Sequence, residues 1–268
     1  MTRRARLDAE LVRRGLARSR EQAAELVAAG QVRVPGRTAV KAATQVEVGD
    51  PIVVDEPAGE TFVSRGGHKL VGALDAFAAQ GLVVAGRRVL DAGASTGGFT
   101  DVVLRRGARE VVCVDVGYGQ LAWALQTDDR VTVLDRTNVR ELTLDAIGEP
   151  ADLVVADLSF ISLRLVLPAL AAVTTPEADL VPMVKPQFEV GREALGAGGV
   201  VRDPGQRADA VEAVAVFAHQ ELGLGVAGVV ASPLPGPAGN VEYFLWLRAD
   251  AAPLDRAVLD AAVAAGPA

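Results

Sequence analysis

The sequence predicts an α/β protein in which a doubly wound, Rossmann-like sheet of seven strands follows a small α+β domain. From Ser64 onward, short runs rich in Val, Leu and Ala alternate with helix-compatible segments, as expected of parallel strands joined by crossover helices. A glycine-rich turn follows the first of these runs. Only the turn-rich segment 233–240 joins the last two runs, which leaves no room for a helix, so we expect the last strand to be antiparallel.

The N-terminal part is predicted to form an αα-hairpin with a small sheet. One helix is expected over 7–14, and Ser19 with Gln22 three residues later is a capping box for a second helix that ends at Gly30. Short strands are expected at 31–34, 38–40, 46–48 and 52–54. We assign the chain to a small domain, a linker and a large domain over 1–59, 60–63 and 64–268.

The large domain should carry its functional residues directly after its strands. The strands are predicted at 87–91, 111–116, 131–135, 152–157, 179–185, 226–232 and 242–248, with a helix over 67–80 before the first. A doubly wound sheet binds its ligands at the carboxyl ends of the strands, so the residues that follow them are the candidates for a site.

The turn after the first strand indicates a nucleoside-containing cofactor. Glycines between a strand and a helix let backbone N–H groups approach a ligand closely. Asp91 directly precedes these glycines; a carboxylate there would repel a pyrophosphate but can accept from the amino group of an amino-acid-like cofactor. Asp115 ends the second strand about seventeen residues past Gly98, where an acid suits ribose hydroxyls. We therefore favour S-adenosylmethionine (SAM) over a dinucleotide.

The cofactor-binding residues expected from this reasoning come from the turn and from the ends of the neighbouring strands. They are Asp91, Gly93, Ala94, Ser95, Thr96, Gly97, Gly98, Phe99, Asp115, Val116, Asn138 and Asp157. Asn138, just after the third strand, is the candidate for the adenine end of SAM.

Composition argues against membrane and metal-dependent classes. The longest apolar run, 165–173, contains Pro168 and is too short for a membrane span, and the N-terminus is not an apolar secretory signal. Cys113, His68 and His219 form no metal-ligand set. We expect a cytoplasmic monomer without a metal.

Charge is distributed unevenly along the chain. The formal net charge is −7, but residues 1–41 hold ten basic and four acidic side chains, whereas residues 42–268 hold seventeen basic and thirty acidic ones. A basic module on an acidic body indicates a nucleic-acid partner for the module. No aromatic residue precedes Phe62, so recognition by the module should depend on shape and phosphates rather than on base stacking.

The candidate RNA contacts are basic residues of both domains. They are Arg3, Arg4, Arg6, Arg18, Arg20 and Lys41 in the small domain, and Arg65, Arg136 and Arg140 near the carboxyl edge of the large one. For each single side chain, local salt bridging is the alternative.

The three lysines among 24 arginines indicate positions where a guanidinium would not serve, because an ammonium can lose its proton. Lys185 and Asp157 end predicted strands, Glu242 begins the antiparallel strand and Lys69 lies on the helix before the first strand, so these four should meet at one sheet edge. Beside a SAM site they suit methyl transfer to a ribose 2′-hydroxyl, since a desolvated lysine can accept its proton. Two ordinary surface salt bridges are the alternative.

Six segments resemble the TlyA group of ribosomal RNA 2′-O-methyltransferases, which are sometimes labelled haemolysins. They lie at 6–16, 64–70, 91–100, 156–162, 184–189 and 239–244. The resemblance implies an N-terminal S4-type RNA-binding domain and a methyltransferase domain similar to the FtsJ/RrmJ group, with SAM as donor and cytidine ribose of small- and large-subunit rRNA as acceptor. The Lys–Asp–Lys–Glu tetrad of that group falls on Lys69, Asp157, Lys185 and Glu242. In relatives the modification confers sensitivity to cyclic-peptide antibiotics such as capreomycin.

Three other functions agree less well with the sequence. A pore-forming protein, suggested by the haemolysin label, lacks support from any apolar span or long basic amphipathic helix. A small-molecule methyltransferase would leave the basic module without a role. A pure RNA-binding protein would leave the filled glycine loop and lysine positions without one. We therefore expect an enzyme that acts on rRNA within ribosomal subunits.

Overall fold

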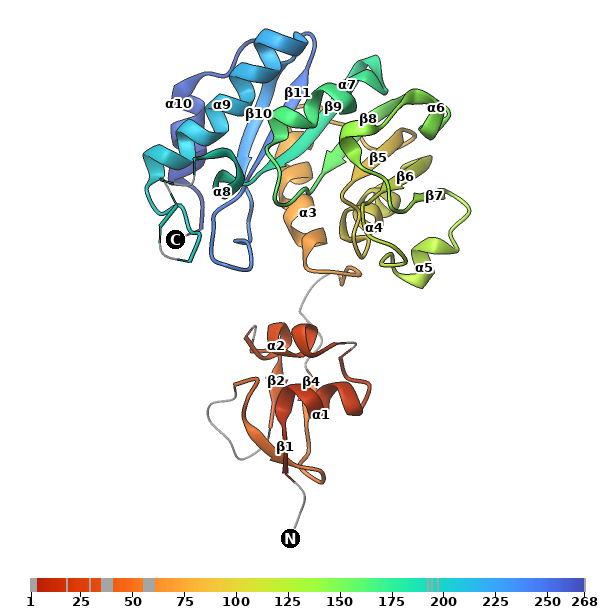
Figure 1. Ribbon diagram of the computed structural model, residues 1–268, viewed down its shortest axis with the longest axis vertical. Helices are drawn as coiled ribbons and strands as arrows, with labels where there is room; N and C mark the ends of the chain where they lie inside the picture. Colours follow the sequence, from red (N-terminus) through yellow and green to blue (C-terminus); the bar gives the residue numbers. More distant parts are fainter. Residues whose placement is uncertain are drawn as a thin grey trace. The chain divides into compact units, whose positions relative to one another are not determined.

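The computed structural model describes residues 4–17, 19–28, 30–34, 41–54, 61–191, 193, 195–196 and 198–267. The chain divides into two compact units, Met1–Thr61 and Phe62–Ala268, each described by itself below (Figure 1).

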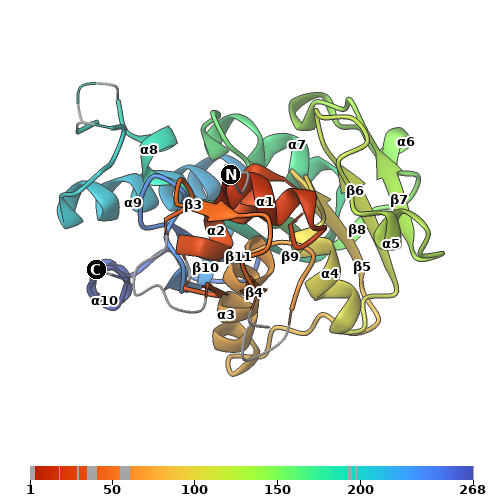
Figure 2. The same cartoon turned by 90° about the horizontal axis from the view of Figure 1, so that it is seen from below.

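The described part of the first unit contains two helices and four short strands. In chain order they are β1 (Arg4–Arg6), α1 (Leu7–Arg13), α2 (Arg20–Ala28), β2 (Val32–Arg33), β3 (Gln45–Glu47) and β4 (Val53–Val54). Strand β1 pairs with β3 and β2 with β4, both antiparallel. Helices α1 and α2 pack on each other over a core that includes Leu7, Leu11, Ala23 and Val46 (Figure 2).

The two predicted helices of this unit are confirmed. The Ser19 hydroxyl accepts from the backbone N–H of Gln22 at 3.1 Å, which is the N-terminal cap expected from the sequence. Strand β1 was not predicted, because a three-residue strand with two arginines carries no apolar alternation. The strand expected at 38–40 lies outside the described residues.

The second unit contains a mixed sheet of seven strands. Its strands are β5 (Arg88–Ala92), β6 (Glu110–Val114), β7 (Val131–Leu134), β8 (Ala151–Ala156), β9 (Thr174–Val184), β10 (Gly225–Ala231) and β11 (Tyr243–Arg248). Their order is β10-β11-β9-β8-β5-β6-β7. Strand β11 lies between β9 and β10 and is antiparallel to both, so the prediction for the last strand is confirmed.

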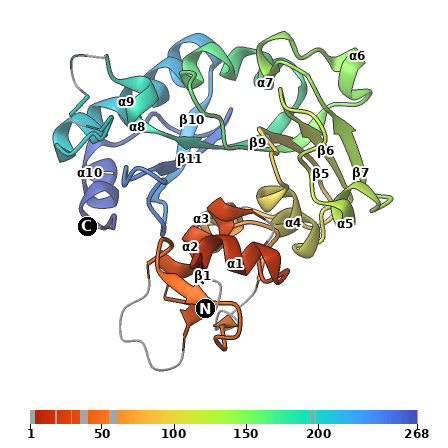
Figure 3. The ribbon, with the colours of Figure 1, turned by 60° about the horizontal axis from the view of Figure 1, so that its bottom comes forward.

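Helices cover both faces of this sheet (Figure 3). Their bounds are α3 (Gly66–Ala78), α4 (Gly98–Arg105), α5 (Trp123–Gln126), η1 (Val139–Glu141), α6 (Leu144–Ile147), η2 (Leu163–Leu165), α7 (Leu167–Ala172), α8 (Pro186–Glu189), α9 (Pro204–Leu222) and α10 (Arg256–Ala264). Helices α3 to α5 pack on one face, and α6, α7, α9 and α10 pack on the other.

The central strands carry apolar residues on both of their faces because both faces are buried. In β5, Val89 belongs to the core under α3 and α4, whereas its neighbour Leu90 belongs to the core on the opposite face. The helices cover the two faces of the sheet but not the carboxyl ends of β5, β6, β8 and β9, and polar residues lie at these ends. Among the described residues, no helix is long and apolar enough to cross a membrane.

Candidate active site

The loop between β5 and α4 needs glycine at two positions. Gly93 and Gly97 have φ angles of 85° and 96°. A Cβ on Gly93 would lie 2.5 Å from the carbonyl oxygen of Asp157, and one on Gly97 would overlap the Leu125 side chain. The loop therefore packs closely against Asp157, which follows β8, and against helix α5. At these two contacts a side chain larger than that of glycine does not fit.

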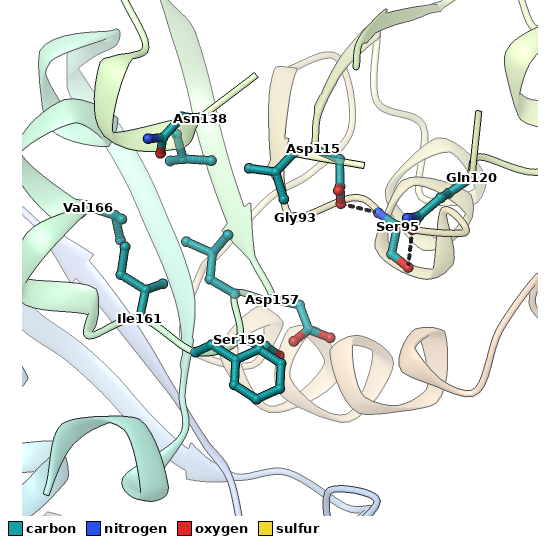
Figure 4. A pocket seen from close by; sticks show the side chains of 13 residues that line it. Gly93, Ser95, Asp115, Gln120, Asn138, Asp157, Ser159, Ile161 and Val166 are labelled. Atoms are coloured by element: carbon teal, nitrogen blue, oxygen red, sulfur yellow. Dashed lines mark hydrogen bonds between the residues drawn. The ribbon is translucent and has the colours of Figure 1, made fainter. Parts of the chain in front are cut away.

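A pocket of about 460 Å³ lies beside this loop, at the carboxyl ends of β5, β6 and β8 (Figure 4). It is lined by Gly93, Ser95, Asp115, Val116, Gln120, Asn138, Val139, Asp157, Leu158, Ser159, Phe160, Ile161 and Val166. A concave, largely apolar site with a few polar groups is typical of small-molecule binding.

Six of the predicted cofactor residues line this pocket, namely Gly93, Ser95, Asp115, Val116, Asn138 and Asp157. The other six, Asp91, Ala94, Thr96, Gly97, Gly98 and Phe99, are not among its lining residues. Phe99 is 3% exposed and lies against Phe244, with ring centroids 5.9 Å apart, so it belongs to the core.

Asp115 is oriented by backbone donors on two sides. One carboxylate oxygen accepts from the N–H of Ser95 at 2.8 Å, and the other accepts from the N–H of Gly117 at 2.7 Å. Each oxygen keeps a second lone pair, so the carboxylate can still accept from ribose hydroxyls. On another side of the pocket, the Asn138 side chain caps η1 by accepting from the N–H of Arg140 at 3.1 Å.

Asp91 is fully buried and only half satisfied. Its Oδ2 accepts from the Thr100 hydroxyl at 2.6 Å, whereas Oδ1 has no hydrogen-bond partner among the described residues. Burial raises the pKa of Asp91 to about 7; the Thr100 hydrogen bond opposes this rise, and the negative charge of Asp157 adds to it. A buried acceptor without a partner suits a ligand that brings a positive charge or an N–H group.

The carboxyl ends of β8 and β9 bring Asp157 and Lys185 together. The Lys185 Nζ lies 2.6 Å from Asp157 Oδ1 in an ion pair that lacks hydrogen-bond geometry, and it donates to the Ser159 hydroxyl at 2.8 Å. The Lys185 side chain is 10% exposed and that of Asp157 is 25% exposed. Asp157 of this pair lines the pocket, whereas Lys185 is not among the lining residues.

A second ion pair joins α3 to the start of β11. The Lys69 Nζ donates to Glu242 Oε2 at 2.5 Å, and both side chains are buried. Because Tyr243 pairs with Val184 in the antiparallel ladder, Glu242 lies next to Lys185 at the same sheet edge. The structure thus gathers the four residues into two neighbouring pairs.

Sequence reasoning missed Ser159 as the second partner of Lys185. It also missed Gln120, which lines the pocket and lies 3.5 Å from the Ser95 hydroxyl. Ser159 could have been found, because it follows Asp157 by two residues in the loop after a strand that was already predicted. Gln120 has no such signal, since its place depends on the path of the loop after β6.

The predicted RNA contacts of the first unit are mostly held by local acids. Arg6 and Arg20 both bind the Asp8 carboxylate, and Arg4 lies 3.5 Å from Glu47. The Lys41 side chain is exposed. Two further predicted contacts, Arg3 and Arg18, lie outside the described residues.

The three predicted contacts of the second unit are exposed. Arg65 donates to the carbonyl of Pro235 at 2.6 Å, and the Arg136 guanidinium lies over the Tyr118 ring, 4.2 Å from its centroid. Arg140 is exposed on η1.

The fold and the site together define a Rossmann-like class I methyltransferase. The sheet order with its antiparallel last strand, the glycine loop after β5 and the acid after β6 support this class. The model of the FtsJ-like methyltransferase family matches residues 62–249, and the model of the S4 domain matches residues 5–52. The chain belongs to the TlyA family of FtsJ-like methyltransferases with an S4 domain.

Several relatives support this assignment over nearly their whole length. The chain is 65% identical over 248 residues to the 16S/23S rRNA (cytidine-2′-O)-methyltransferase TlyA of Mycobacterium tuberculosis, covering 92% of this chain and 91% of that protein. It is 42% identical to the putative rRNA methyltransferase YqxC of Bacillus subtilis, covering 91% and 85%. The solved structure of a putative hemolysin from Streptococcus thermophilus is 38% identical, covers 98% of this chain and 96% of that one, and has a TM-score of 0.77.

Proposed function

We propose that this protein transfers a methyl group from SAM to the 2′-hydroxyl of a cytidine ribose in ribosomal RNA. The observation that carries the proposal is the pair of lysine–carboxylate contacts at the sheet edge, one of which borders the pocket. The relatives from Mycobacterium tuberculosis and Campylobacter jejuni are both named as rRNA (cytidine-2′-O)-methyltransferases, which supports the same acceptor.

The pocket residues fit SAM. Asp115 would accept from the ribose hydroxyls, and Val116 and Val139 would contact the adenine beside Asn138. Asp91 does not line the pocket, but its buried, unpartnered Oδ1 suits the cationic amino-acid end of the cofactor. SAM supplies a methyl group on a positively charged sulfur, which a nucleophile can attack in line.

Lys185 is our candidate for the group that takes the proton of the 2′-hydroxyl. Asp157 forms an ion pair with its Nζ and Ser159 accepts one of its N–H groups, so the other two N–H positions of the ammonium have no hydrogen-bond acceptor in the described structure. Because Asp157 also lines the pocket, a cation bound there would compete with Lys185 for the Asp157 carboxylate. Lys185 in its neutral form then accepts the hydroxyl proton as the methyl group is transferred.

Lys69 and Glu242 would act as the fixed half of the tetrad. Both side chains are almost fully buried, so their pair is rigid and its geometry does not depend on substrate. Glu242 lies beside Lys185 in the β9–β11 ladder. Its negative charge would offset the positive charges of Lys69 and Lys185 and so reduce the repulsion between the two lysines.

The experiment that tests this function is methyl transfer from labelled SAM to purified small and large ribosomal subunits, followed by nuclease digestion to locate the label. We expect the label on a ribose 2′-oxygen of cytidine. Label on a base would contradict the proposed acceptor and the lysine mechanism. Transfer to neither subunit, with SAM still bound, would contradict the isolated ribosomal subunits as the substrate and favour a different RNA or a small-molecule acceptor.

A further inference from the structure

A buried carboxylate in the first unit organises two arginines from different elements. Asp8 lies in the first turn of α1, and its side chain is 5% exposed. It accepts from Arg6 Nη2 at 2.7 Å and from Arg6 Nε at 3.1 Å. Its Oδ2, the oxygen that takes Arg6 Nη2, also accepts from Arg20 Nη2 at 3.0 Å. Arg6 ends β1 and Arg20 begins α2, so one oxygen joins three elements.

The shared oxygen places two guanidinium groups side by side. Two guanidinium groups that bind the same oxygen are close enough to repel each other unless an anion offsets their charge. Asp8 supplies that anion: the hydrogen bond from Arg6, and to a lesser degree that from Arg20, holds the pKa of the Asp8 carboxyl well below its usual range despite burial. Asp8 therefore stays ionised at neutral pH, and the cluster of three keeps one net positive charge.

The neighbouring acid of the same helix shows what a purely structural arrangement looks like. Glu10 is buried and binds Arg13 at 2.6 Å and Arg14 at 2.8 Å. The Arg14 guanidinium is 22% exposed and also donates to the carbonyls of Val48 and Asp50, so it ties α1 to the β3–β4 segment. Its donors are used within the fold.

Arg6 and Arg20 differ from Arg14 in what their outer donors face. Their side chains are 45% and 60% exposed, and within the described residues Asp8 is the acceptor found for each guanidinium. Each of them therefore presents N–H groups to solvent while its other edge is held. Guanidinium donors held in this way match the oxygens of a phosphate, and less side-chain entropy is lost when they bind it.

We propose that Asp8 is a positioning residue that holds Arg6 and Arg20 as a paired-guanidinium site for one backbone phosphate of the RNA. This inference rests on the proposed function, since it takes RNA as the partner of the first unit. The inference predicts that removing the Asp8 charge changes RNA affinity in the direction opposite to that expected from net charge alone. Removing an acid from a basic surface should strengthen binding to a polyanion, whereas removing the organiser should weaken it.

The test is the Asp8→Asn variant of the full chain, with binding to ribosomal subunits measured over a range of KCl concentrations. The amide that replaces the carboxylate can still accept from the N–H of Ala9, as Asp8 does at 2.7 Å, but it cannot hold two guanidinium groups by charge. We expect about five- to tenfold weaker binding and a salt slope lower by about one, the loss of one phosphate contact.

The matched control is Glu21→Gln, which makes the same change of charge in the same unit. Glu21 is exposed in the first turn of α2 and has no ion pair with another described residue. We expect its binding to be unchanged or tighter. Binding of Asp8→Asn that equals or exceeds that of Glu21→Gln would overturn the inference.

A second variant guards against misfolding of the first. Arg6→Lys combined with Arg20→Lys keeps both charges and removes both planar forks. Weaker binding of this variant, with its thermal midpoint unchanged, supports the paired site, and wild-type affinity overturns it. If wild-type protein fails to bind ribosomal subunits, the proposed function itself fails. If wild type binds and both variants bind as tightly as wild type, the paired-guanidinium site fails while the proposed function stands.

Discussion

Lys69 and Lys185 form ion pairs of similar length but lie in different surroundings. The Lys69–Glu242 pair is buried, with side chains that are 6% and 1% exposed. The Lys185–Asp157 pair borders the pocket, and its carboxylate is a quarter exposed. A group that exchanges a proton with substrate must be reachable from the pocket, which favours Lys185 over Lys69 for that role.

Replacing Lys185 tests this assignment. We expect Lys185→Ala to lower methyl transfer by at least about a hundredfold, the usual contribution of a positioned proton acceptor, with SAM and RNA binding mostly kept. Lys185→Arg should be equally inactive, because the guanidinium keeps the charge but stays protonated. Single-turnover transfer and SAM titration calorimetry measure the two effects.

The control for this variant is Arg106→Ala, which removes a surface ion pair with Asp75 at the end of α4. It should turn over normally, because exposed pairs contribute little. Near-normal transfer by Lys185→Ala would eliminate Lys185 as the proton acceptor.

Asp91 should make stability depend on pH in a direction opposite to that of most carboxylates. Its folded pKa is about 7, above the unfolded value near 3.8. Between about pH 4 and pH 7 the unfolded chain loses this proton while the folded chain keeps it, so the stabilisation present at low pH is lost as the pH rises. The loss is up to about 1.4 kcal/mol per pH unit for one group and is complete above pH 7.

Asp91→Asn removes this titration. We expect the free energy of unfolding of the variant, relative to wild type, to rise steadily from pH 4 to pH 7 and to level off above it. Urea unfolding at a series of pH values measures this difference. Curves of wild type and variant that stay parallel across the range would show that Asp91 does not titrate there.

At the scale of elements, the loop between β5 and α4 is shaped by its contact with the end of β8. Gly93 has both a left-handed φ and a Cβ position that would meet the Asp157 carbonyl. Gly86 has a left-handed φ of 76° with nothing within 4 Å of its Cβ position. A substitution at Gly86 therefore tests backbone strain alone, whereas one at Gly93 tests backbone strain together with a steric clash.

We expect Gly86→Ala to cost about 1–2 kcal/mol of stability with normal SAM affinity, since only the backbone conformation is strained. Gly93→Ala should in addition push the loop away from Asp157 and weaken SAM binding by about tenfold or more. Calorimetric SAM titration and thermal unfolding of both variants check this. Equal SAM affinity of the two variants would show that the loop adjusts to the added methyl group.

The sheet explains why three of the four residues of the predicted tetrad were predictable as neighbours and the fourth less so. Parallel strands end at a common edge and an antiparallel strand begins there, so Asp157, Lys185 and Glu242 follow from the strand order. Lys69 comes from α3, which lies outside the sheet, and no periodicity tells how far a helix side chain reaches. Its contact with Glu242, 173 residues away, is a result of packing.

Across the molecule, basic side chains outnumber acidic ones over residues 1–41 of the first unit, and the pocket lies in the second unit. We expect Arg6→Ala combined with Arg20→Ala to weaken binding to ribosomal subunits and to flatten its dependence on salt, while SAM affinity stays unchanged. Filter binding at several KCl concentrations and SAM titration measure the two properties.

A control for this variant is Arg256→Ala combined with Arg248→Ala, which removes the same charge from ion pairs with Asp209, Glu212 and Asp250 in the second unit. It should leave the salt slope as in wild type. An unchanged slope in the Arg6 and Arg20 variant would remove the first unit from the RNA interface.

Local sequence patterns were enough to predict the main features of the second unit. Short runs rich in Val, Leu and Ala predict the strands, the glycine-rich turn after the first run predicts a ligand-binding loop, and the missing crossover helix predicts an antiparallel last strand; these signals involve residues close together in the chain. The rarity of lysine pointed to Lys69 and Lys185 in the same way.

The burial of polar groups and the partners that they contact became known from the folded chain. Folding left Asp91 with one unpartnered oxygen, placed Ser159 on Lys185, and made Asp8 the common partner of Arg6 and Arg20. The physical reason is that desolvation and hydrogen bonding depend on atoms brought together by folding from distant parts of the chain. The sequence position of an acidic residue therefore does not show whether folding will leave one of its oxygens unpartnered, give it two arginines to organise or expose it to solvent.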